Sequence, residues 1–473
     1  MAGEAQKLGV IITTENIRTN STSLSNFIAS KQRFGFIVKT VTEGSAEDGT
    51  HYLTGTTADQ RANNIRTWLA NHYLSEGIEY VLLIGNPHPT TFTSNASIPM
   101  KMTWPRSAEI EYRESPSDYY FADLTSNWNP DGDSMFGEYS EVGISGGIDR
   151  IAEVIIGRVP FYGTFTDLNS ILNKFISYGE ATGDLSWRQT ILIPAAISNF
   201  APEDHNQDGD ATDSGEYLDP SLRTFGADWG EALHTLAVNN SFTPYTLYEK
   251  TGPYTDGSAY PNTTSDASLN STNVVGEWDD HYGFVTWWGH GSETGAYRRY
   301  WTNDTFIIDH ITQHPGETTD TTFFSTSNTA SLPNDFPSFV VQVSCSNGAP
   351  ENSGNLGYLL LLQGGIGTVS ASRVSWYSLG DWEPGSGDGT GDNATYGYRI
   401  FEKMAASDMT IGEALSELRS NTSISNSAWW MNVTDFNLYG DPSLGFENTA
   451  TSDDNYEEND TLATAYDLSS SET

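Results

Sequence analysis

Short, uninterrupted apolar runs recur along the chain and constrain its fold more than any other sequence feature. Several are rich in β-branched or aromatic residues and end in a turn of small residues. A run of this kind indicates a strand that is buried on both faces, as in a parallel sheet. The predicted strands are Lys7–Thr14, Phe34–Val41, Tyr80–Gly85, Ile151–Pro160, Thr190–Ala196, Pro244–Tyr248, Phe284–Trp288, Phe339–Ser344 and Ile366–Ala371.

Amphipathic segments alternate with these strands. One of them opens at Thr57 with Gln60 three residues later, the pattern of a helix capping box. The alternation predicts an α/β fold with helices on both faces of the sheet. The rhythm repeats after a hinge at 183–186, so we expect two subdomains, residues 1–183 and 184–446. The predicted helices are Ser23–Arg33, 57–73, Leu168–Tyr178, Asp228–Val238, Leu356–Leu362, Tyr396–Ala406 and Ile411–Arg419.

Two of the predicted strands end in turns that carry a reactive side chain. Phe284–Trp288 leads into a Gly-His-Gly-Ser-Glu turn that contains His290, and Phe339–Ser344 leads into a Cys-Ser-Asn-Gly turn that contains Cys345. The C-terminal ends of parallel strands are where α/β proteins place their sites. Cys345 is the only cysteine, so it has no disulfide partner and belongs to no thiolate cluster. It is therefore either a buried structural thiol or a nucleophile.

The order and spacing of the two residues favour the nucleophile. His290 precedes Cys345 by 345 − 290 = 55 residues, close to the roughly 50 residues of the caspase-type arrangement. A free thiol has a pKa of about 8.5, so a neighbouring imidazole is needed to increase the thiolate fraction and to protonate the leaving group. Gly291 would let a backbone N–H approach a reacting carbonyl, and we expect it to form an oxyanion hole with the Cys345 amide.

These motifs resemble those of the gingipain-type cysteine peptidases, the C25 family of the caspase-like clan. The similar blocks are Gly289–Thr294, Val343–Gly348, Ile156–Pro160, Ser117–Asp123 and Leu438–Leu444, and they occur in the family's order over roughly residues 7 to 446. The resemblance implies a caspase- or gingipain-like α/β/α sandwich of two subdomains with mostly parallel sheets. It also implies a secreted cysteine endopeptidase acting on protein or peptide substrates. Cys345 would form the acyl-enzyme, and His290 would be the general acid and base.

Two other functions stay open at this point. A sortase-like transpeptidase of the same family would pass the acyl group to an amine, and the motifs do not distinguish it from a hydrolase. A non-catalytic, calcium-binding surface module would be expected to have lost the histidine or the cysteine, but the chain has both His290 and Cys345. We therefore expect a hydrolase.

In the family, an acidic residue at the end of the first strand of the second subdomain orients the histidine. The corresponding stretch, 194–199, has no acid. Glu203 or Asp204 could take this role, Glu293 is a further candidate, or the enzyme works as a Cys-His dyad.

The resemblance also implies the substrate-binding residues. Asp228 lies about two residues from the place where the family's basic-specific members hold a cationic side chain, and Trp376 matches a wall of the specificity pocket. Gly289 and Val343, in the two reactive motifs, are expected to contact the substrate as well. A site in a protein of net charge −40 attracts cations, so a basic or uncharged P1 residue is expected, with Asp381 and Glu383 as further acidic contacts.

Two loops have the spacing of calcium ligands. The first offers oxygen side chains at loop positions 1, 3, 5, 7 and 12 with glycine at position 6, which is the EF-hand pattern. An upstream aspartate could add a ligand. A second loop repeats the first half of this pattern but has Gly215 at position 12, with Asp213 or Glu216 as the closing ligand. The expected Ca²⁺ ligands are Asp123, Asn127, Asn129, Asp131, Asp133 and Glu138 in the first loop, and Asp204, Asn206, Asp208, Asp210 and Glu216 in the second.

The charge balance excludes several partners. The chain has 62 acidic residues against 22 Lys+Arg, and such a surface repels nucleic acids and anionic membranes. No apolar run approaches the length of a membrane span, and no transition-metal motif such as His-Glu-x-x-His occurs. We expect a secreted monomer. The N-terminal residues lack the features of a signal peptide, so the chain is expected to be a trimmed part of a secreted precursor.

The C-terminal tail differs in composition from the rest. Residues 447–473 are acidic and polar, and Asp453–Leu468 resembles the opening of a bacterial pre-peptidase C-terminal domain. We expect this tail to be disordered by itself.

Overall fold

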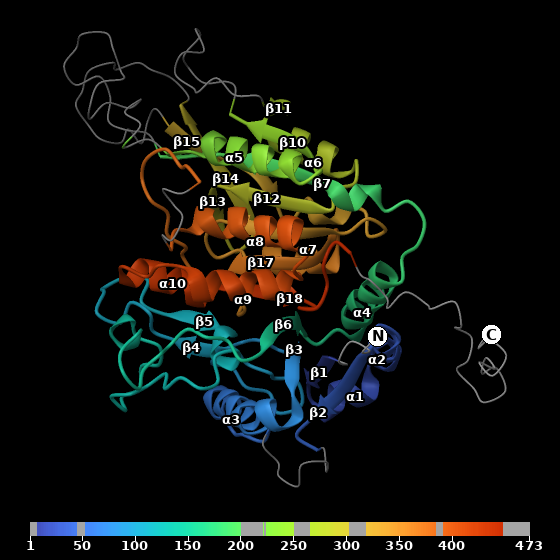
Figure 1. Cartoon of the computed structure of the whole chain (residues 1–473), viewed down its shortest axis with the longest axis vertical. Coiled ribbons are helices and arrows are strands. Elements are labelled where there is room, and N and C mark those ends of the chain that lie inside the picture. Colours follow the sequence, from blue (N-terminus) through green and yellow to red (C-terminus); the bar gives the residue numbers. More distant parts are fainter. Residues whose placement is uncertain are drawn as a thin grey trace, which may run out of the picture.

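The fold is known from a computed structural model (Figure 1). It describes residues 7–44, 53–199, 221, 224–249, 265–301, 318–384 and 391–447. The main elements of the N-terminal half are β1 (Lys7–Ile12), α1 (Glu15–Asn20), α2 (Leu24–Arg33), β2 (Phe36–Val41), α3 (Ala58–Glu76), β3 (Ile78–Gly85), β4 (Lys101–Thr103), β5 (Ser115–Ser117), β6 (Ile155–Pro160) and α4 (Phe165–Gly179). Those of the C-terminal half are β7 (Thr190–Ala195), β8 (Ile197–Asn199), β9 (Thr224–Phe225), α5 (Gly226–Asn239), β10 (Thr243–Tyr248), β11 (Ala267–Ser268), α6 (Ser271–Trp278), β12 (Phe284–Trp288), β13 (His290–Ser292), β14 (Gly295–Trp301), β15 (Thr318–Ser325), β16 (Ser338–Val343), α7 (Leu356–Leu362), β17 (Gly365–Ala371), α8 (Asn393–Ser407), α9 (Ile411–Asn421), α10 (Ser427–Asp435) and β18 (Phe436–Gly440).

One eleven-stranded sheet runs through both halves of the molecule. Its strand order is β11-β10-β7-β12-β16-β17-β18-β6-β3-β1-β2. The described pairs in this sheet are parallel except for β17 with β18. The α/β fold with a mostly parallel sheet is therefore confirmed.

Helices cover both faces of this sheet because the strands are apolar on both faces. Along β12, Phe284 packs into one hydrophobic cluster and the next residue, Val285, packs into another on the opposite face. The first cluster is shared by both halves and contains residues of α2, α4, α5, α8 and α9. On the opposite face, α3 and α10 cover the N-terminal half and α6 covers part of the C-terminal half. The result is a layered α/β/α arrangement (Figure 1).

The two halves meet where β18, near the end of the chain, pairs with β6. Tyr439 is the partner of Arg158, and the chains approach so closely that a Cβ on Gly157 would lie 2.5 Å from the Gly440 carbonyl oxygen. The Arg158 guanidinium is fully buried and bonds both carboxylate oxygens of Asp118, at 2.8 and 2.6 Å. The two predicted subdomains thus share a single sheet, and their boundaries stay a prediction.

The predicted strands are all present, with ends shifted by a few residues. Several elements near the site were not predicted, among them β8, whose Ser198 carbonyl binds His290. The sheet β13-β14-β15 begins with the polar sequence His-Gly-Ser, which lacks the composition of a strand. The helix α10 and the strand β18 follow each other directly at 435–436, without the turn residues that mark a boundary.

Candidate active site

The two reactive residues follow neighbouring strands that end at the same level of the sheet. β12 and β16 are parallel neighbours, and Trp288 is the partner of Val343. The Gly289 N–H donates to the Val343 carbonyl oxygen at 3.2 Å, and the Val343 side chain is fully buried. Gly289 and Val343 were both predicted to contact the substrate. In the structure, these two backbone groups are hydrogen-bonded to each other. His290 and Cys345, each two residues beyond this paired position, reach the same edge of the sheet.

His290 begins the β13–β14 hairpin, where it is the partner of Tyr297. Its Nε2 lies 2.8 Å from the carbonyl oxygen of Ser198 in β8. Because a carbonyl only accepts, this bond puts a proton on Nε2 and leaves Nδ1 of the neutral ring as the acceptor. Burial lowers the pKa of His290 below its usual 6.5, so the ring is neutral at pH 7.

Cys345 lies in a tight turn after β16. Its Sγ is 3.6 Å from the Ser375 carbonyl oxygen, and burial raises the pKa of the thiol above its usual value. The next residue, Ser346, has a left-handed backbone with φ of 58°, and its N–H donates to the Arg373 carbonyl oxygen at 2.6 Å. Such a conformation is costly for a residue with a side chain and is typical of functional turns.

The turns that carry these residues are packed against each other. A Cβ on Gly291 would lie 2.5 Å from the Cys345 carbonyl oxygen and 2.7 Å from its nitrogen, so no larger residue fits there without a shift. Tyr377 adds a contact that the sequence did not indicate: its ring centroid is 6.3 Å from that of His290. Burial raises the pKa of Tyr377, and the charge of Cys345 adds to this effect. An imidazole whose Nδ1 is left as the acceptor, at the same edge of the sheet as a thiol, is an arrangement suited to nucleophilic catalysis.

The group that orients His290 is a backbone carbonyl. Within the described residues, the hydrogen-bond partner of the His290 ring is Ser198, in the 194–199 stretch that lacks an acid. Glu293, one of the candidates, is exposed, and its carboxylate accepts from Asn352 Nδ2 at 2.6 Å. Glu293 is therefore wrong as the third member, and Glu203 and Asp204 lie outside the described residues.

Trp376, the predicted pocket wall, is half-buried and follows the residue whose carbonyl contacts the thiol. Its backbone N–H donates to Asn432 Oδ1 at 2.9 Å. Two residues of the N-terminal half, which sequence reasoning missed, also contact its ring. The Arg106 guanidinium lies 4.2 Å from the ring centroid, and the exposed Tyr112 ring meets it edge-on at 6.1 Å. The loop that contains both residues thus reaches the site.

Asp228 lies in the first turn of α5, and the start of this helix adjoins the site. The Gly226 N–H donates to the Ala196 carbonyl oxygen at 2.9 Å, and Phe225 is the partner of Ile197 in β8. β8 is also the strand whose Ser198 carbonyl binds His290. These contacts place the start of α5, which carries Asp228, beside β8, and the role of Asp228 in substrate binding stays a prediction. Asp381 and Glu383 lie in the segment that follows Trp376 and Tyr377.

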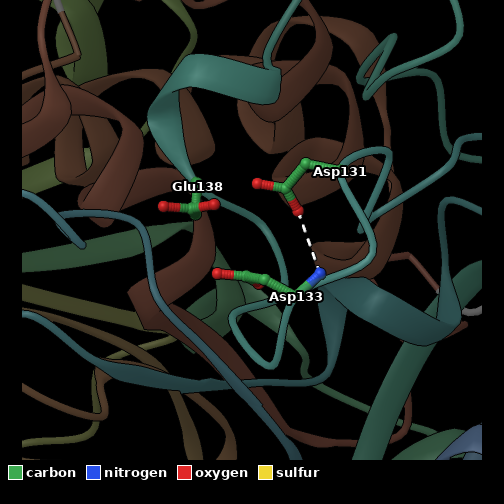
Figure 2. Close-up of side chains that lie close together, drawn as sticks. All are labelled: Asp131, Asp133 and Glu138. Carbon is green, nitrogen blue, oxygen red and sulfur yellow. Dashed lines mark hydrogen bonds between the residues drawn. The ribbon is translucent and has the colours of Figure 1, made fainter.

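The first predicted calcium loop brings three carboxylates together. One oxygen from each of Asp131, Asp133 and Glu138 lies within 4.8 Å of the others, and Figure 2 shows the side chains pointing toward one another. The Asn127 and Asn129 amide oxygens accept from backbone N–H groups of the same loop, at 3.1 and 2.9 Å.

A fourth carboxylate adjoins this group. Glu141 is 3% exposed, its Oε2 accepts from the Glu138 N–H at 3.1 Å, and its Oε1 has no hydrogen-bond partner among the described residues. Burial raises the pKa of Glu141 to about 7, with a contribution from the charges of Glu138 and Asp131. A bound cation would offset the repulsion between these carboxylates and would give Glu141 Oε1 a partner. The carboxylate oxygens therefore fit a hard divalent ion.

Asp123 was predicted to join this loop, and that prediction is wrong. Its carboxylate accepts from the Ser126 N–H at 3.2 Å and interacts with the charges of Asp149 and Glu153 instead of joining the three-carboxylate group. Asp123 follows a short buried helical turn, Tyr119–Phe121, and is itself fully buried, whereas Asp131 and Asp133 are exposed. The whole second loop, with Asp204, Asn206, Asp208, Asp210, Asp213 and Glu216, lies outside the described residues, as do 448–473 of the tail.

Within the described ranges, no helix has the length and apolar character needed to cross a membrane.

Comparisons with known proteins agree with this geometry. A family model described as "Peptidase family C25" matches residues 4–446. A search of curated proteins finds no match. Among solved structures, the crystal structure of the Arg-specific cysteine proteinase gingipain R (RGPB) is similar, with a TM-score of 0.58, 16% identity, and coverage of 95% of this chain and 80% of that chain. A complex of the Porphyromonas gingivalis RgpB pro- and mature domains has a TM-score of 0.57 at 16% identity and covers 93% and 80%. A third, described only as a protease structure, has a TM-score of 0.55 at 14% identity, with 93% and 78% covered.

Proposed function

The chain belongs to peptidase family C25 and is a cysteine peptidase, and from this premise we propose that it is a secreted endopeptidase in which Cys345 and His290 carry the reaction. The observation that carries the proposal is the packing of Gly291 directly on the Cys345 backbone, next to an imidazole that the Ser198 carbonyl holds. Protein or peptide chains are the substrates.

The proposed reaction uses the two side chains in turn. His290 Nδ1 takes the thiol proton while Sγ attacks the scissile carbonyl carbon, and the amides of Gly291 and Cys345 stabilise the oxyanion. The imidazolium then protonates the leaving amine as the C–N bond breaks. Water, deprotonated by the same nitrogen, releases the second product from the thioester and restores the thiol.

The test compares the protein with its Cys345→Ala variant on fluorogenic peptides that differ at P1. We expect cleavage by the parent alone. Peptides cleaved equally by both proteins, or a thiol that resists alkylation while every peptide stays intact, would contradict the assignment. Transfer to an added amine in preference to water would identify a transpeptidase.

The proposal includes a preference for a basic P1 residue. Asp228 lies in the first turn of α5, whose start adjoins the strand β8 that binds His290, and the chain carries a net charge of −40. Both features favour a cationic side chain. The P1 panel measures this preference, and Asp228→Asn should reduce kcat/KM for peptides with arginine or lysine at P1 more than for peptides with alanine.

We also propose that Ca²⁺ binds Asp131, Asp133 and Glu138 and stabilises the loop that holds them. Chelation by EDTA should lower the melting temperature of the parent, and the Glu138→Gln variant should show a smaller decrease. The Asp280→Asn variant, which removes an exposed acid elsewhere, should respond like the parent. A melting temperature that EDTA does not change would contradict the calcium proposal and leave the catalytic proposal untouched.

A further inference from the structure

Asn347, two residues after Cys345, connects the two turns that carry the reactive residues. It is fully buried, with 0% of its surface exposed. Its Nδ2 donates to the carbonyl oxygens of Ser292 and Gly295, at 2.5 and 3.1 Å, and both of these belong to the His290 hairpin. Its Oδ1 accepts from the Ser344 hydroxyl, which precedes Cys345. One amide therefore bonds residues on both sides of the site.

The network continues into the sheet. The Trp287 Nε1–H donates to the Ser344 hydroxyl at 3.0 Å, and Trp287 and Ser344 are both fully buried. Hydrogen bonds thus run from β12 through Ser344 and Asn347 to the hairpin. Because these groups are fully buried, each would cost free energy if its partner moved away, so the network favours one relative position of the turns.

The chemical requirement fits asparagine in particular. This position needs one acceptor for the Ser344 hydroxyl and two donors for the two hairpin carbonyls. A neutral amide supplies both, whereas a carboxylate at this place would face two carbonyl oxygens without donors. The direct contact of Gly291 with Cys345 shows how closely the turns must be aligned.

We propose that Asn347 is a positioning residue that sets the distance and orientation between the His290 imidazole and the Cys345 thiol. The inference rests on the proposed function, since it assigns a role within the same reaction. Asn347 touches no reacting atom. It acts by fixing the backbone on both sides of the pair.

The test uses the Asn347→Ala variant of the full chain with Asn437→Ala as a matched control. Asn437, in β18, is also buried, accepts one bond from the Asp118 N–H at 2.9 Å and donates two, to the Pro116 and Asp435 carbonyls at 3.1 and 2.8 Å. It bonds neither reactive turn. Melting temperature, kcat and KM on the preferred peptide, and the rate of thiol alkylation by iodoacetamide are measured for both variants, with and without His290→Ala.

Both variants should melt at a lower temperature than the parent. Only Asn347→Ala should lower kcat, by about 10- to 100-fold, because a displacement of about 1 Å at the reacting atoms has an effect of this size. Its KM should change by no more than about twofold, since the substrate contacts remain. His290→Ala should alter the alkylation rate of the parent strongly and that of Asn347→Ala much less, because the imidazole and thiol are no longer coupled.

Equal kcat values for the two asparagine variants, or an unchanged effect of His290→Ala on alkylation, would overturn the inference while leaving the proposed function standing. A parent that neither cleaves a peptide nor reacts with iodoacetamide would overturn both. If Asn347→Ala does not fold, Ser344→Ala serves instead: a folded Ser344→Ala protein with parental kcat would overturn the inference, and a several-fold lower kcat at unchanged KM would support it.

Discussion

Burial shifts the pKa values of His290 and Cys345 in opposite directions. It lowers the pKa of His290 and raises the pKa of Cys345, so the resting pair at neutral pH is a neutral imidazole and a protonated thiol. The Ser198 carbonyl orients the ring but carries no full negative charge to stabilise an imidazolium. In the proposed mechanism, His290 therefore acts as a general base during attack and does not hold a preformed thiolate.

The pH dependence of kcat/KM should reflect this state. The base form of His290 is needed, so activity should rise with pH through an apparent pKa below 6.5. The charges that act on the ring are Arg299, which lowers its pKa, and Asp320, which raises it; Asp320 is bonded to Arg299 at 2.8 and 3.0 Å. The charge of Asp435 raises the pKa of Cys345, and the charge of Cys345 raises the pKa of Tyr377.

Asp320→Asn should shift the acidic limb of the profile to still lower pH, since only the opposing charge of Arg299 remains. Asp280→Asn removes an exposed acid that is not among the charges acting on the ring, so it should leave the limb in place. A limb above pH 6.5 in the parent, or an upward shift in Asp320→Asn, would contradict the general-base assignment.

The β13–β14 hairpin, which carries His290, packs closely against the Cys345 turn at Gly291. Gly291→Ala should lower kcat/KM by about 100-fold, because the added Cβ must push the hairpin away from Cys345. Gly276→Ala is the control, since a Cβ there meets nothing within 4 Å and sits in helix α6. The control should keep full activity and gain slightly in melting temperature. If a folded Gly291→Ala protein keeps the parental kcat/KM, the close packing of the two turns is not needed for catalysis and the prediction is wrong.

The protein combines a net charge of −40 with buried carboxyl groups, and among the described residues three of these, Asp123, Glu141 and Asp435, have a raised pKa. Burial raises the pKa of each to about 7. In the unfolded chain these groups lose their protons near pH 4, so the folded state binds more protons between pH 4 and 7. Their contribution to stability is present below pH 4 and is lost as the pH rises through 7. The lowered pKa values of His290 and Lys174 act in the opposite sense, but they are two groups against three.

The melting temperature, measured in EDTA, should therefore be lower at pH 7 than at pH 5. Asp123→Asn should flatten this dependence because it removes one of the three titrations, and Asp280→Asn should leave it unchanged. A melting temperature that increases from pH 5 to pH 7 would contradict the assignment of these carboxyls as protonated in the folded protein.

The sequence by itself determined the parts of this protein that depend on local pattern. Apolar runs fixed the buried strands, and the residues that follow two of them, His290 and Cys345, were placed at one edge because parallel neighbours end at the same edge. The spacing of carboxylates in the 127–138 loop likewise predicted the convergence of Asp131, Asp133 and Glu138, since ligands within one turn are held by a short chain.

Only the tertiary structure decided which distant groups complete the site. The partner of the His290 ring is a backbone carbonyl, which no side-chain motif can reveal, and Arg106 reaches Trp376 from the other half of the chain. Asp123 was assigned to the wrong cluster because proximity in sequence does not set the direction of a buried side chain. Asn347 was part of a predicted motif, but its two carbonyl partners come from a hairpin that the sequence did not indicate. Contacts of this kind depend on how separately formed elements pack, and the packing is set by the whole core rather than by any one segment.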